Sequence, residues 1–157
     1  MLSSNIQNTL KKAIINGNSL MLVDLIRNFI KNNDEEKVNL TSIKEILKFI
    51  GNSLRGLTIE GYKGDFPTFI EPVFLTPGIE IGDTVLLGPN VLLGKECKLG
   101  DFCELSNTIL FNGVSLGKYC KLKWCIVDQY LNLPQKFEAK EAYITKNAKG
   151  DIEILYF

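Results

Sequence analysis

A six-residue spacing of large apolar side chains constrains this sequence more than any other feature. From residue 69 to residue 111 every sixth residue is large and apolar, and a smaller apolar residue follows four positions later. Six residues turn an α-helix by about 600°, which is far from a whole number of turns, so no helix places these side chains on one face. The large residues are Phe69, Leu75, Ile81, Leu87, Leu93, Leu99, Leu105 and Phe111, and the smaller ones are Val73, Ile79, Val85, Val91, Cys97, Cys103 and Ile109.

A chain that turns a corner every six residues accommodates this spacing. Each hexapeptide supplies one short strand and one corner, and three hexapeptides make a coil of about 18 residues. Coils stacked at the strand spacing of about 4.8 Å form parallel ladders, with the large side chains pointing to the common axis. The fold class is therefore mainly β: a hexapeptide-repeat parallel β-helix of about four coils over residues 69–138. In this register Leu87, Leu105 and Leu122 lie above one another.

Glycine follows the large residue at Gly82, Gly88, Gly94 and Gly100. We expect these glycines to supply corner conformations that residues with a Cβ adopt only at a cost. An antiparallel sheet, in which apolar residues alternate, also tolerates a six-residue spacing. It does not explain the glycines or the scarcity of hairpin turn pairs, so the β-helix is the better interpretation.

Residues 1–53 instead have helical periodicity and are expected to form about three short helices. Ser19 is the expected cap of the second helix. Ser42 and Glu45 have capping-box spacing for the third, which Gly51 is expected to end. The polar stretch 31–37 is expected to be a loop. The helices either contribute to the core, with capping of one end of the β-helix as the favoured role, or provide a docking surface.

Two further segments complete the expected organisation. Residues 54–68 contain three glycines and a proline and are interpreted as a linker. Residues 139–157 place two apolar stretches around a turn near Gly150, which predicts a C-terminal hairpin that closes the solenoid. An open solenoid end exposes strand edges, so a cap is expected there.

Composition excludes several classes of function. Lys plus Arg and Asp plus Glu are both 18, so the chain has no basic excess with which to attract nucleic acid or an anionic membrane. No apolar run reaches the roughly 18 residues of a membrane span, and the N-terminus lacks the layout of a secretory signal. With its four cysteines interpreted as reduced thiols, the chain is expected to be cytoplasmic.

The sequence contains no histidine, which removes the usual bases of hexapeptide enzymes. An imidazole base and a three-histidine zinc site are both excluded. Acyl transfer without histidine would require a carboxylate in the repeat region, where Asp83, Asp101 and Glu104 are available. Such residues are more often solvated outward positions.

The cysteines are predicted to be structural. Cys97, Cys103 and Cys120 occupy positions where Val and Ile stand elsewhere, so we expect small buried side chains, with Cys103 and Cys120 stacked one coil apart. Cys125 is expected to be more exposed. No C-x₂-C pair and no phosphate-binding glycine loop is present. The sequence therefore assigns no catalytic residue, no cofactor-binding residue and no metal ligand.

Residues 69–134 also carry more specific motifs. These are Ile81-Gly82, Gly88-Pro89-Asn90-Val91, the units Leu105–Ile109 and Leu122–Ile126, the ending Cys125-Ile126-Val127-Asp128, and Gly150–Ile154 in the tail. Together they resemble the C-terminal left-handed β-helix of sugar-1-phosphate nucleotidyltransferases, which make nucleotide sugars. The glycine-rich catalytic signature of that family has no counterpart in residues 1–68. No catalytic residue is therefore carried over, and we expect either the C-terminal part of a longer enzyme or a stand-alone relative.

The leading functional hypothesis is a non-catalytic β-helix module that serves oligomerisation or regulation in nucleotide-sugar synthesis. The expected partners are further copies of the chain, as a dimer or trimer, and a nucleotidyltransferase catalytic domain or subunit. The alternative is a histidine-independent acyltransferase acting on a nucleotide sugar or an amine.

Overall fold

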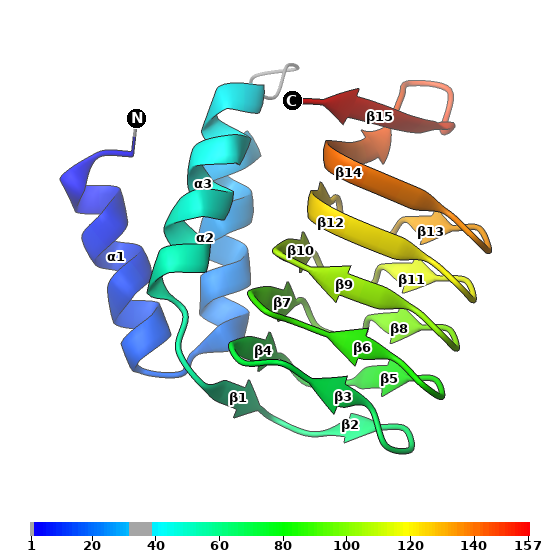
Figure 1. The fold of residues 1–157 in the computed structure, drawn as a ribbon. Coiled ribbons are helices and arrows are strands. Elements are labelled where there is room, and N and C mark those ends of the chain that lie inside the picture. Colours follow the sequence, from blue (N-terminus) through cyan, green and yellow to red (C-terminus); the bar gives the residue numbers. More distant parts are fainter. Residues whose placement is uncertain (1, 32–38) are drawn as a thin grey trace.

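The computed structural model describes residues 2–31 and 39–157, in which three helices lie alongside a β-solenoid of about five turns (Figure 1). The helices are α1 Ser4–Ile15, α2 Ser19–Lys31 and α3 Leu40–Ser53. The strands are β1 Leu57–Ile59, β2 Tyr62–Lys63, β3 Thr68–Phe69, β4 Val73–Leu75, β5 Ile79–Ile81, β6 Leu86–Leu87, β7 Val91–Leu93, β8 Lys98–Leu99, β9 Glu104–Ser106, β10 Thr108–Leu110, β11 Ser115–Leu116, β12 Lys121–Val127, β13 Asn132–Leu133, β14 Glu138–Lys146 and β15 Ile152–Tyr156.

Each coil contributes one strand to each of three faces. The first face stacks β1, β4, β7 and β10, the second stacks β2, β5, β8, β11 and β13, and the third stacks β3, β6 and β9. The longer strands β12 and β14 run through a corner, so they extend the third face with their first residues and the first face with their last. All pairings between coils are parallel, which confirms the predicted β-helix.

The solenoid begins earlier than the expected boundary at residue 69. In the segment interpreted as a linker, β1 pairs with β4 and β2 with β5, so this segment forms the first coil. The six-residue pattern does not detect this first coil, because the spacing between its residues and their partners in the next coil is not constant. Partners are sixteen residues apart at Ile59 and Leu75, seventeen at Tyr62 and Ile79, and eighteen at Phe69 and Leu87.

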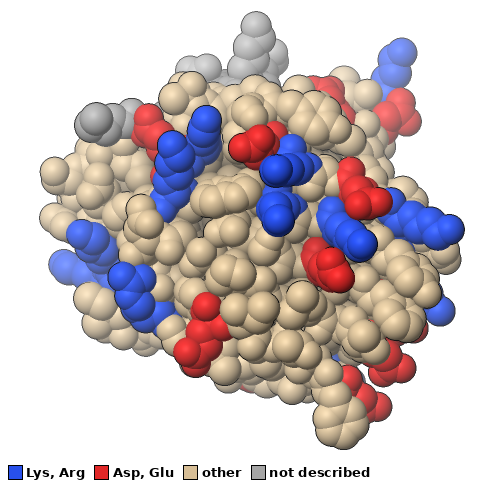
Figure 2. Space-filling model, viewed as in Figure 1, with Lys and Arg blue, Asp and Glu red and all other residues tan. Residues whose placement is uncertain are grey.

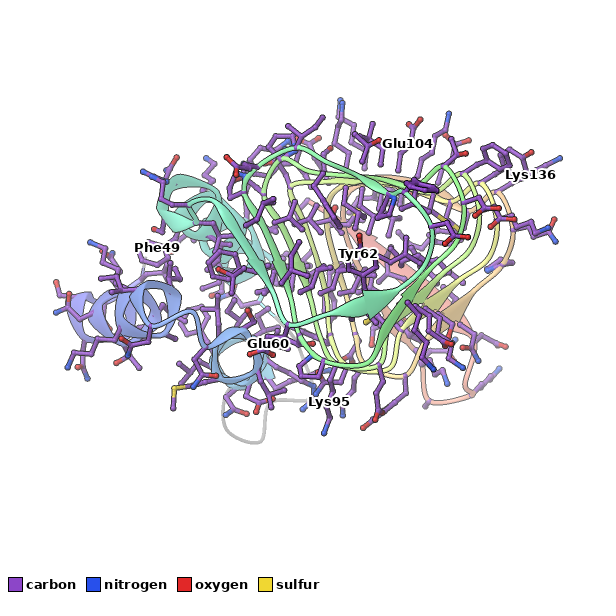
Figure 3. The ribbon with its side chains drawn as sticks, turned by 90° about the horizontal axis from the view of Figure 1, so that it is seen from below. Phe49, Glu60, Tyr62, Lys95, Glu104 and Lys136 are labelled. Atoms are coloured by element: carbon purple, nitrogen blue, oxygen red, sulfur yellow. The ribbon has the colours of Figure 1, made fainter. Side chains whose placement is uncertain are left out.

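The inward side chains form one continuous apolar core along the axis. Leu87 pairs with Leu105 and Leu105 with Leu122, as predicted, and all three are buried. Seen along the axis, the coils superpose and side chains fill the space between their walls (Figure 3). The core is dry hydrocarbon with thiols between the aliphatic residues, so burial of apolar surface is its main source of stability.

The glycines of the repeat act differently from the expectation. Gly82, Gly94 and Gly100 do not have positive φ, and the left-handed corner positions are occupied largely by other residues, such as Phe102 and Asn107. A Cβ on Gly100 would lie 2.8 Å from the carbonyl carbon of Gly117 in the next coil. Close approach of neighbouring coils therefore requires these glycines. Of the four glycines, Gly88, with φ of 115°, adopts a corner conformation that a residue with a Cβ would adopt only at a cost.

The helices cover the side of the solenoid and do not cap its end. They run along the solenoid axis beside the first face (Figure 1), and in the view along the axis they lie to one side of the coils (Figure 3). The capping expectation is therefore wrong. The reason is a column of outward apolar residues, one per coil, that needs cover: Phe74, Leu92, Ile109, Ile126 and Tyr143.

The helix starts also differ in detail. Asn18 Oδ1 accepts from the backbone N–H of Met21, and Asn39 Oδ1 accepts from those of Thr41 and Ser42. These asparagines are the caps, one and three residues before the serines that were expected. Gly51 lies inside α3 and does not end it. The expected loop 31–37 falls, apart from Lys31, outside the described residues.

The predicted C-terminal hairpin is present. β14 and β15 pair antiparallel, and Gly150 donates its backbone N–H to the carbonyl of Asn147 in the turn. β15 thus pairs with one edge of the last coil. Within the described residues, no helix is long and apolar enough to span a membrane.

Candidate interaction faces

The first face is occupied by the chain's own helices. Ile126 and Tyr143 are fully buried there, packed in one apolar cluster with residues of the helices such as Ile26 and Ile46. Helix burial of this kind stabilises by about 25 cal/mol for each Å² of apolar surface removed from water. The first face is consequently closed to any other partner in this structure.

Asp128, just after β12, binds the helices to the solenoid. Its Oδ2 lies 2.7 Å from Nζ of Lys31 and accepts a hydrogen bond from Thr145 Oγ1 at 3.2 Å. Arg27 Nε lies 3.6 Å from Oδ1, which also accepts the backbone N–H of Gln129. This ion pair is a structural link between α2 and the solenoid.

Burial alone would raise the pKa of Asp128. The hydrogen bonds from Lys31 and Gln129 and the nearby cations outweigh it, so the pKa is lowered from its usual value. Burial alone would lower the pKa of Lys31, but the bond to Asp128 reverses this and the pKa is raised. Both shifts favour the charged forms of the pair.

The second face is exposed and carries a single column of polar side chains. Lys63 pairs with Glu80, Glu80 with Lys98, and the column continues through Ser115 and Asn132. Lys98 Nζ lies 3.4 Å from Glu80 Oε2. The charges along the column are therefore positive, negative and positive, one per coil, followed by two neutral residues.

Glycines flank the column on both sides. On one side lie Gly82, Gly100 and Gly117, whose missing Cβ atoms would collide with the next coil. On the other side Gly78 and Gly113 alternate with Glu96 and Tyr130 at the corner. A hollow of about 710 Å³ lies over the column and extends to the side of Gly78 and Gly113. The exposed rings of Tyr62 and Tyr130 also line this hollow.

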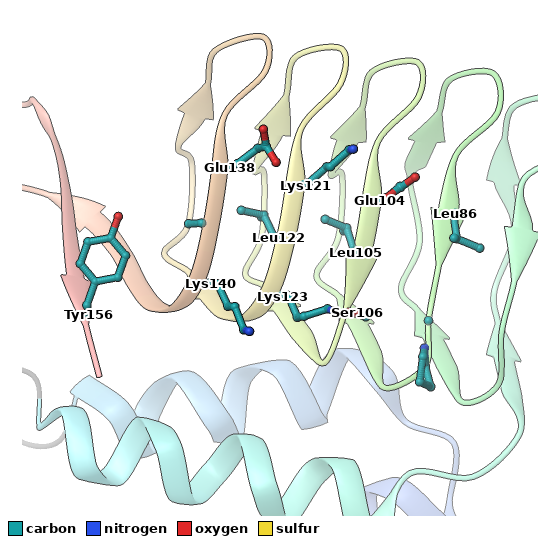
Figure 4. Close-up of a pocket in the computed structure, with 13 residues that line it drawn as sticks. Leu86, Glu104, Leu105, Ser106, Lys121, Leu122, Lys123, Glu138, Lys140 and Tyr156 are labelled. Carbon is teal, nitrogen blue, oxygen red and sulfur yellow. The ribbon is translucent and has the colours of Figure 1, made fainter.

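The third face is a groove of about 710 Å³ with two outward columns (Figure 4). The first column is Leu86, Glu104, Lys121 and Glu138, and the second is Gly88, Ser106, Lys123 and Lys140. Tyr156 of β15 stands at one end of the groove (Figure 4). In the space-filling view, Lys and Arg side chains are interspersed with Asp and Glu over the solenoid (Figure 2).

The three candidate carboxylates do not form one site. Asp101 Oδ1 accepts the backbone N–H of Asp83 at 2.8 Å, and its Oδ2 lies 3.6 Å from Lys118 Nζ. This carboxylate braces a corner between coils. Asp83 is exposed beside it, and Glu104 lies on the third face in the charged column. The structure gives none of the three a base-like environment, which burial would have to create.

All four cysteines are free and buried, as predicted for three of them. Cys125 is fully buried too, so its expected exposure is wrong: its Sγ lies inside the last coil, 3.5 Å from the carbonyl of Ala139. Cys103 and Cys120 are stacked one coil apart, and their thiols donate hydrogen bonds to the carbonyls of Gly117 and Pro134. The interaction between the two thiols raises the pKa of Cys103 and lowers that of Cys120. Among residues 2–31 and 39–157 no group of His, Cys, Asp and Glu could hold a metal ion.

Sequence reasoning missed the charged columns of both open faces. The signal exists, because Lys63, Glu80 and Lys98 are spaced by 17 and 18 residues, one coil apart. Placing Lys63 in its column requires the register of the first coil, which the six-residue pattern does not supply.

Comparison with known families decides the relationship of the chain. A family model described as the GMPPB C-terminal domain matches residues 69–148, about half of the chain. This chain belongs to the GMPPB C-terminal domain family. The match confirms the resemblance to the C-terminal β-helix of sugar-phosphate nucleotidyltransferases. The comparisons with curated proteins and with solved structures gave no match.

The GMPPB C-terminal domain match covers the solenoid from Phe69 onwards. Glu80 and Lys98 of the second face and Lys121, Lys123 and Lys140 of the third lie inside it, whereas the helices and Lys63 lie outside. The two open faces therefore belong largely to the family's domain, and the helical cover of the first face comes from the segment that precedes it.

Proposed function

We propose that this chain is a non-catalytic β-helix module that serves assembly, and through assembly regulation, in nucleotide-sugar synthesis. The family match supports a nucleotidyltransferase-like C-terminal module. The observation that carries the assembly role is the charged column of the second face, Lys63, Glu80 and Lys98, which is exposed.

This column is complementary to itself under a two-fold axis. Consider two copies face to face with antiparallel solenoid axes, and the two-fold axis between the coils of Glu80 and Lys98. Glu80 of each copy then lies opposite Lys98 of the other, and Lys63 lies opposite Ser115. No like charges meet in the column, and the interface is isologous, as two-fold dimers require.

The exposure of the face favours the same arrangement. The hollow over the second face leaves the charged column accessible to a second copy, as the facing surfaces of stacked sheets are before they pack. Charge complementarity then fixes the register and orientation of the two copies. Within an enzyme assembly the same module would join a nucleotidyltransferase catalytic domain or subunit to its neighbours.

The test is the molar mass in solution with charge-reversed variants. Size-exclusion chromatography with light scattering should give a dimer for the natural sequence at high micromolar concentration. Lys98→Glu places Glu80 opposite a carboxylate and should raise the dissociation constant of the dimer about tenfold or more. The double variant Glu80→Lys/Lys98→Glu restores opposite charges between positions 80 and 98, both within each copy and across the interface, and should dimerise again.

The matched control is Lys118→Glu, which makes the same charge change at the corner beside Asp101, away from the charged column. It should leave the dimer intact. A monomeric natural protein at high micromolar concentration would contradict the proposed assembly. A dimer that is indifferent to Lys98→Glu would retain assembly but remove it from the second face.

A further inference from the structure

The third face holds two lysines at a place where the fold brings their charges together. Lys123 of β12 and Lys140 of β14 are register partners on neighbouring parallel strands, and both are exposed. Neighbouring strands lie about 4.8 Å apart, and like charges directly opposite each other destabilise a sheet. Two ammonium groups in register therefore have an unfavourable interaction that an anion between them would remove.

No carboxylate offsets this pair within the described part of the chain. Three other lysines have close partners: Lys98 has Glu80, Lys118 has Asp101, and Lys31 has Asp128. Among residues 2–31 and 39–157, no carboxylate oxygen lies within 4 Å of Lys123 or Lys140 Nζ. The remaining side chain of their column is Ser106, a neutral hydrogen-bonding group.

The neighbouring column has a net negative charge. Lys121 stands between Glu104 and Glu138 as a register partner of both, so its charge already has opposite neighbours. The groove as a whole, with three lysines and two glutamates, has a net charge of +1, and its positive side is the column of Lys123 and Lys140. In Figure 4 these two lysines and Ser106 lie along the side of the groove toward the helices, while Glu104, Lys121 and Glu138 lie along the other.

The groove also has an aromatic end. Tyr156 of β15 is 62% exposed and stands beyond the strand that carries Lys140 (Figure 4). An exposed ring in this position offers an apolar surface and one hydroxyl to a ligand that extends along the groove. The groove therefore combines two cations, a serine hydroxyl and an exposed ring.

We propose that the groove of the third face binds an organic diphosphate. The phosphate oxygens pair with Lys123 and Lys140, Ser106 donates a hydrogen bond to them, and the organic part of the ligand rests against the ring of Tyr156. The site uses a different face from the proposed dimer and does not depend on it. It requires no catalysis, because binding alone relieves the repulsion between the lysines.

The direct test is titration calorimetry at low ionic strength with inorganic pyrophosphate, uridine diphosphate and uridine as probes. Pyrophosphate should bind, uridine diphosphate should bind more tightly, and uridine alone should not bind. Lys123→Gln/Lys140→Gln should lower the affinity for both phosphate-bearing probes about tenfold or more, because charge-assisted hydrogen bonds are lost. Tyr156→Ala should weaken uridine diphosphate and leave pyrophosphate unchanged.

The matched control is Lys95→Gln/Lys118→Gln, which removes the same charge from exposed lysines outside both the groove and the charged column of the second face. It should change either affinity by no more than about twofold, the size expected from net charge alone. An equal loss in the control would reveal non-specific attraction and overturn the proposal. Natural affinity in Lys123→Gln/Lys140→Gln would overturn it as well.

Thermal unfolding without any probe gives an independent readout. If Lys123 and Lys140 repel each other, Lys123→Gln should leave the melting temperature unchanged or raise it at low salt, and added salt should remove the difference. A lowered melting temperature would show that Lys123 stabilises the empty fold, and would contradict the repulsion on which the site depends.

Discussion

Lys31 Nζ lies 2.7 Å from Asp128 Oδ2, so the last residue of α2 is bound directly to the end of a solenoid strand. The two residues are 97 positions apart in the chain. Their ion pair fixes the helices against the first face at the end of the solenoid nearest β15, where Lys31 also lies 5.7 Å from the ring centre of Tyr143. The ion pair thus adds an electrostatic link to the apolar packing that holds the helices on the first face.

Asp128→Asn should lower the free energy of unfolding by about 2 kcal/mol at pH 7, because a partly buried cation loses its charged partner. The folded-state pKa of Asp128 is lowered, so its contribution is present above the unfolded pKa of about 4 and is lost as the pH falls below it. The difference between the natural protein and the variant should therefore shrink below pH 4. Urea unfolding between pH 2.5 and 7 measures it, and a difference independent of pH would contradict the ion-pair explanation.

Leu105→Ala should cost about 2–5 kcal/mol, because it opens a cavity in the axial core between Leu87 and Leu122. Leu86→Ala removes the same atoms from an outward position on the third face and should cost less than about 1 kcal/mol. Denaturant unfolding of both variants provides the comparison. Equal losses would mean that the inward and outward positions are wrongly assigned.

Two glycine-to-alanine changes should have opposite signs. Gly100→Ala should destabilise by roughly 1–3 kcal/mol, since its Cβ would lie 2.8 Å from the backbone of the next coil. Gly51→Ala, inside α3, meets only an ordinary contact of 3.5 Å with Asn90 Nδ2 and should stabilise by about 0.5–1 kcal/mol. Melting temperatures measured side by side decide the matter. A stable Gly100→Ala protein would remove the steric reason for the glycine column.

The four thiols should be unreactive in the folded protein. Burial raises the pKa of Cys97 to about 12 and that of Cys125 to about 11, and all four sulfur atoms lie inside the solenoid. Cys120, whose pKa is lower, is equally enclosed, so access limits its reaction. Alkylation at pH 8 followed by mass spectrometry should label no cysteine before unfolding and all four afterwards. Rapid labelling of Cys125 in the folded protein would contradict its burial and support the exposed position expected from the sequence.

The isolated chain should catalyse neither nucleotidyl transfer nor acyl transfer. No phosphate-binding glycine loop is present in the sequence, and a carboxylate near pKa 4 is a weak base at pH 7 unless burial raises its pKa. The assays combine sugar-1-phosphates with nucleoside triphosphates, and acyl-coenzyme A with amino sugars. Turnover that disappears in Asp101→Asn or Glu104→Gln would support the acyltransferase hypothesis, whereas turnover unaffected by both changes would indicate a contaminant.

The sequence alone determined the solenoid and its core. Phe69, Leu87 and Leu105 recur at a spacing that a short-range rule produces, because each hexapeptide makes its own strand and corner. The same rule placed Cys103 above Cys120, and two apolar stretches around a turn predicted the final hairpin near Gly150. It failed for the first coil, where the spacing to the next coil changes from sixteen to eighteen residues and Gly64 stands opposite Ile81.

Only the tertiary structure decided what each face of the solenoid does. The helices are amphipathic in sequence, but a helix stripe fits an end cap, a bundle or a solenoid wall equally well. The column Phe74, Leu92, Ile109, Ile126 and Tyr143 gives the first face an outward apolar surface, and packing the helices against it removes this surface from water. Lys123 and Lys140 are seventeen residues apart in sequence, and the stacking of the coils brings them into register.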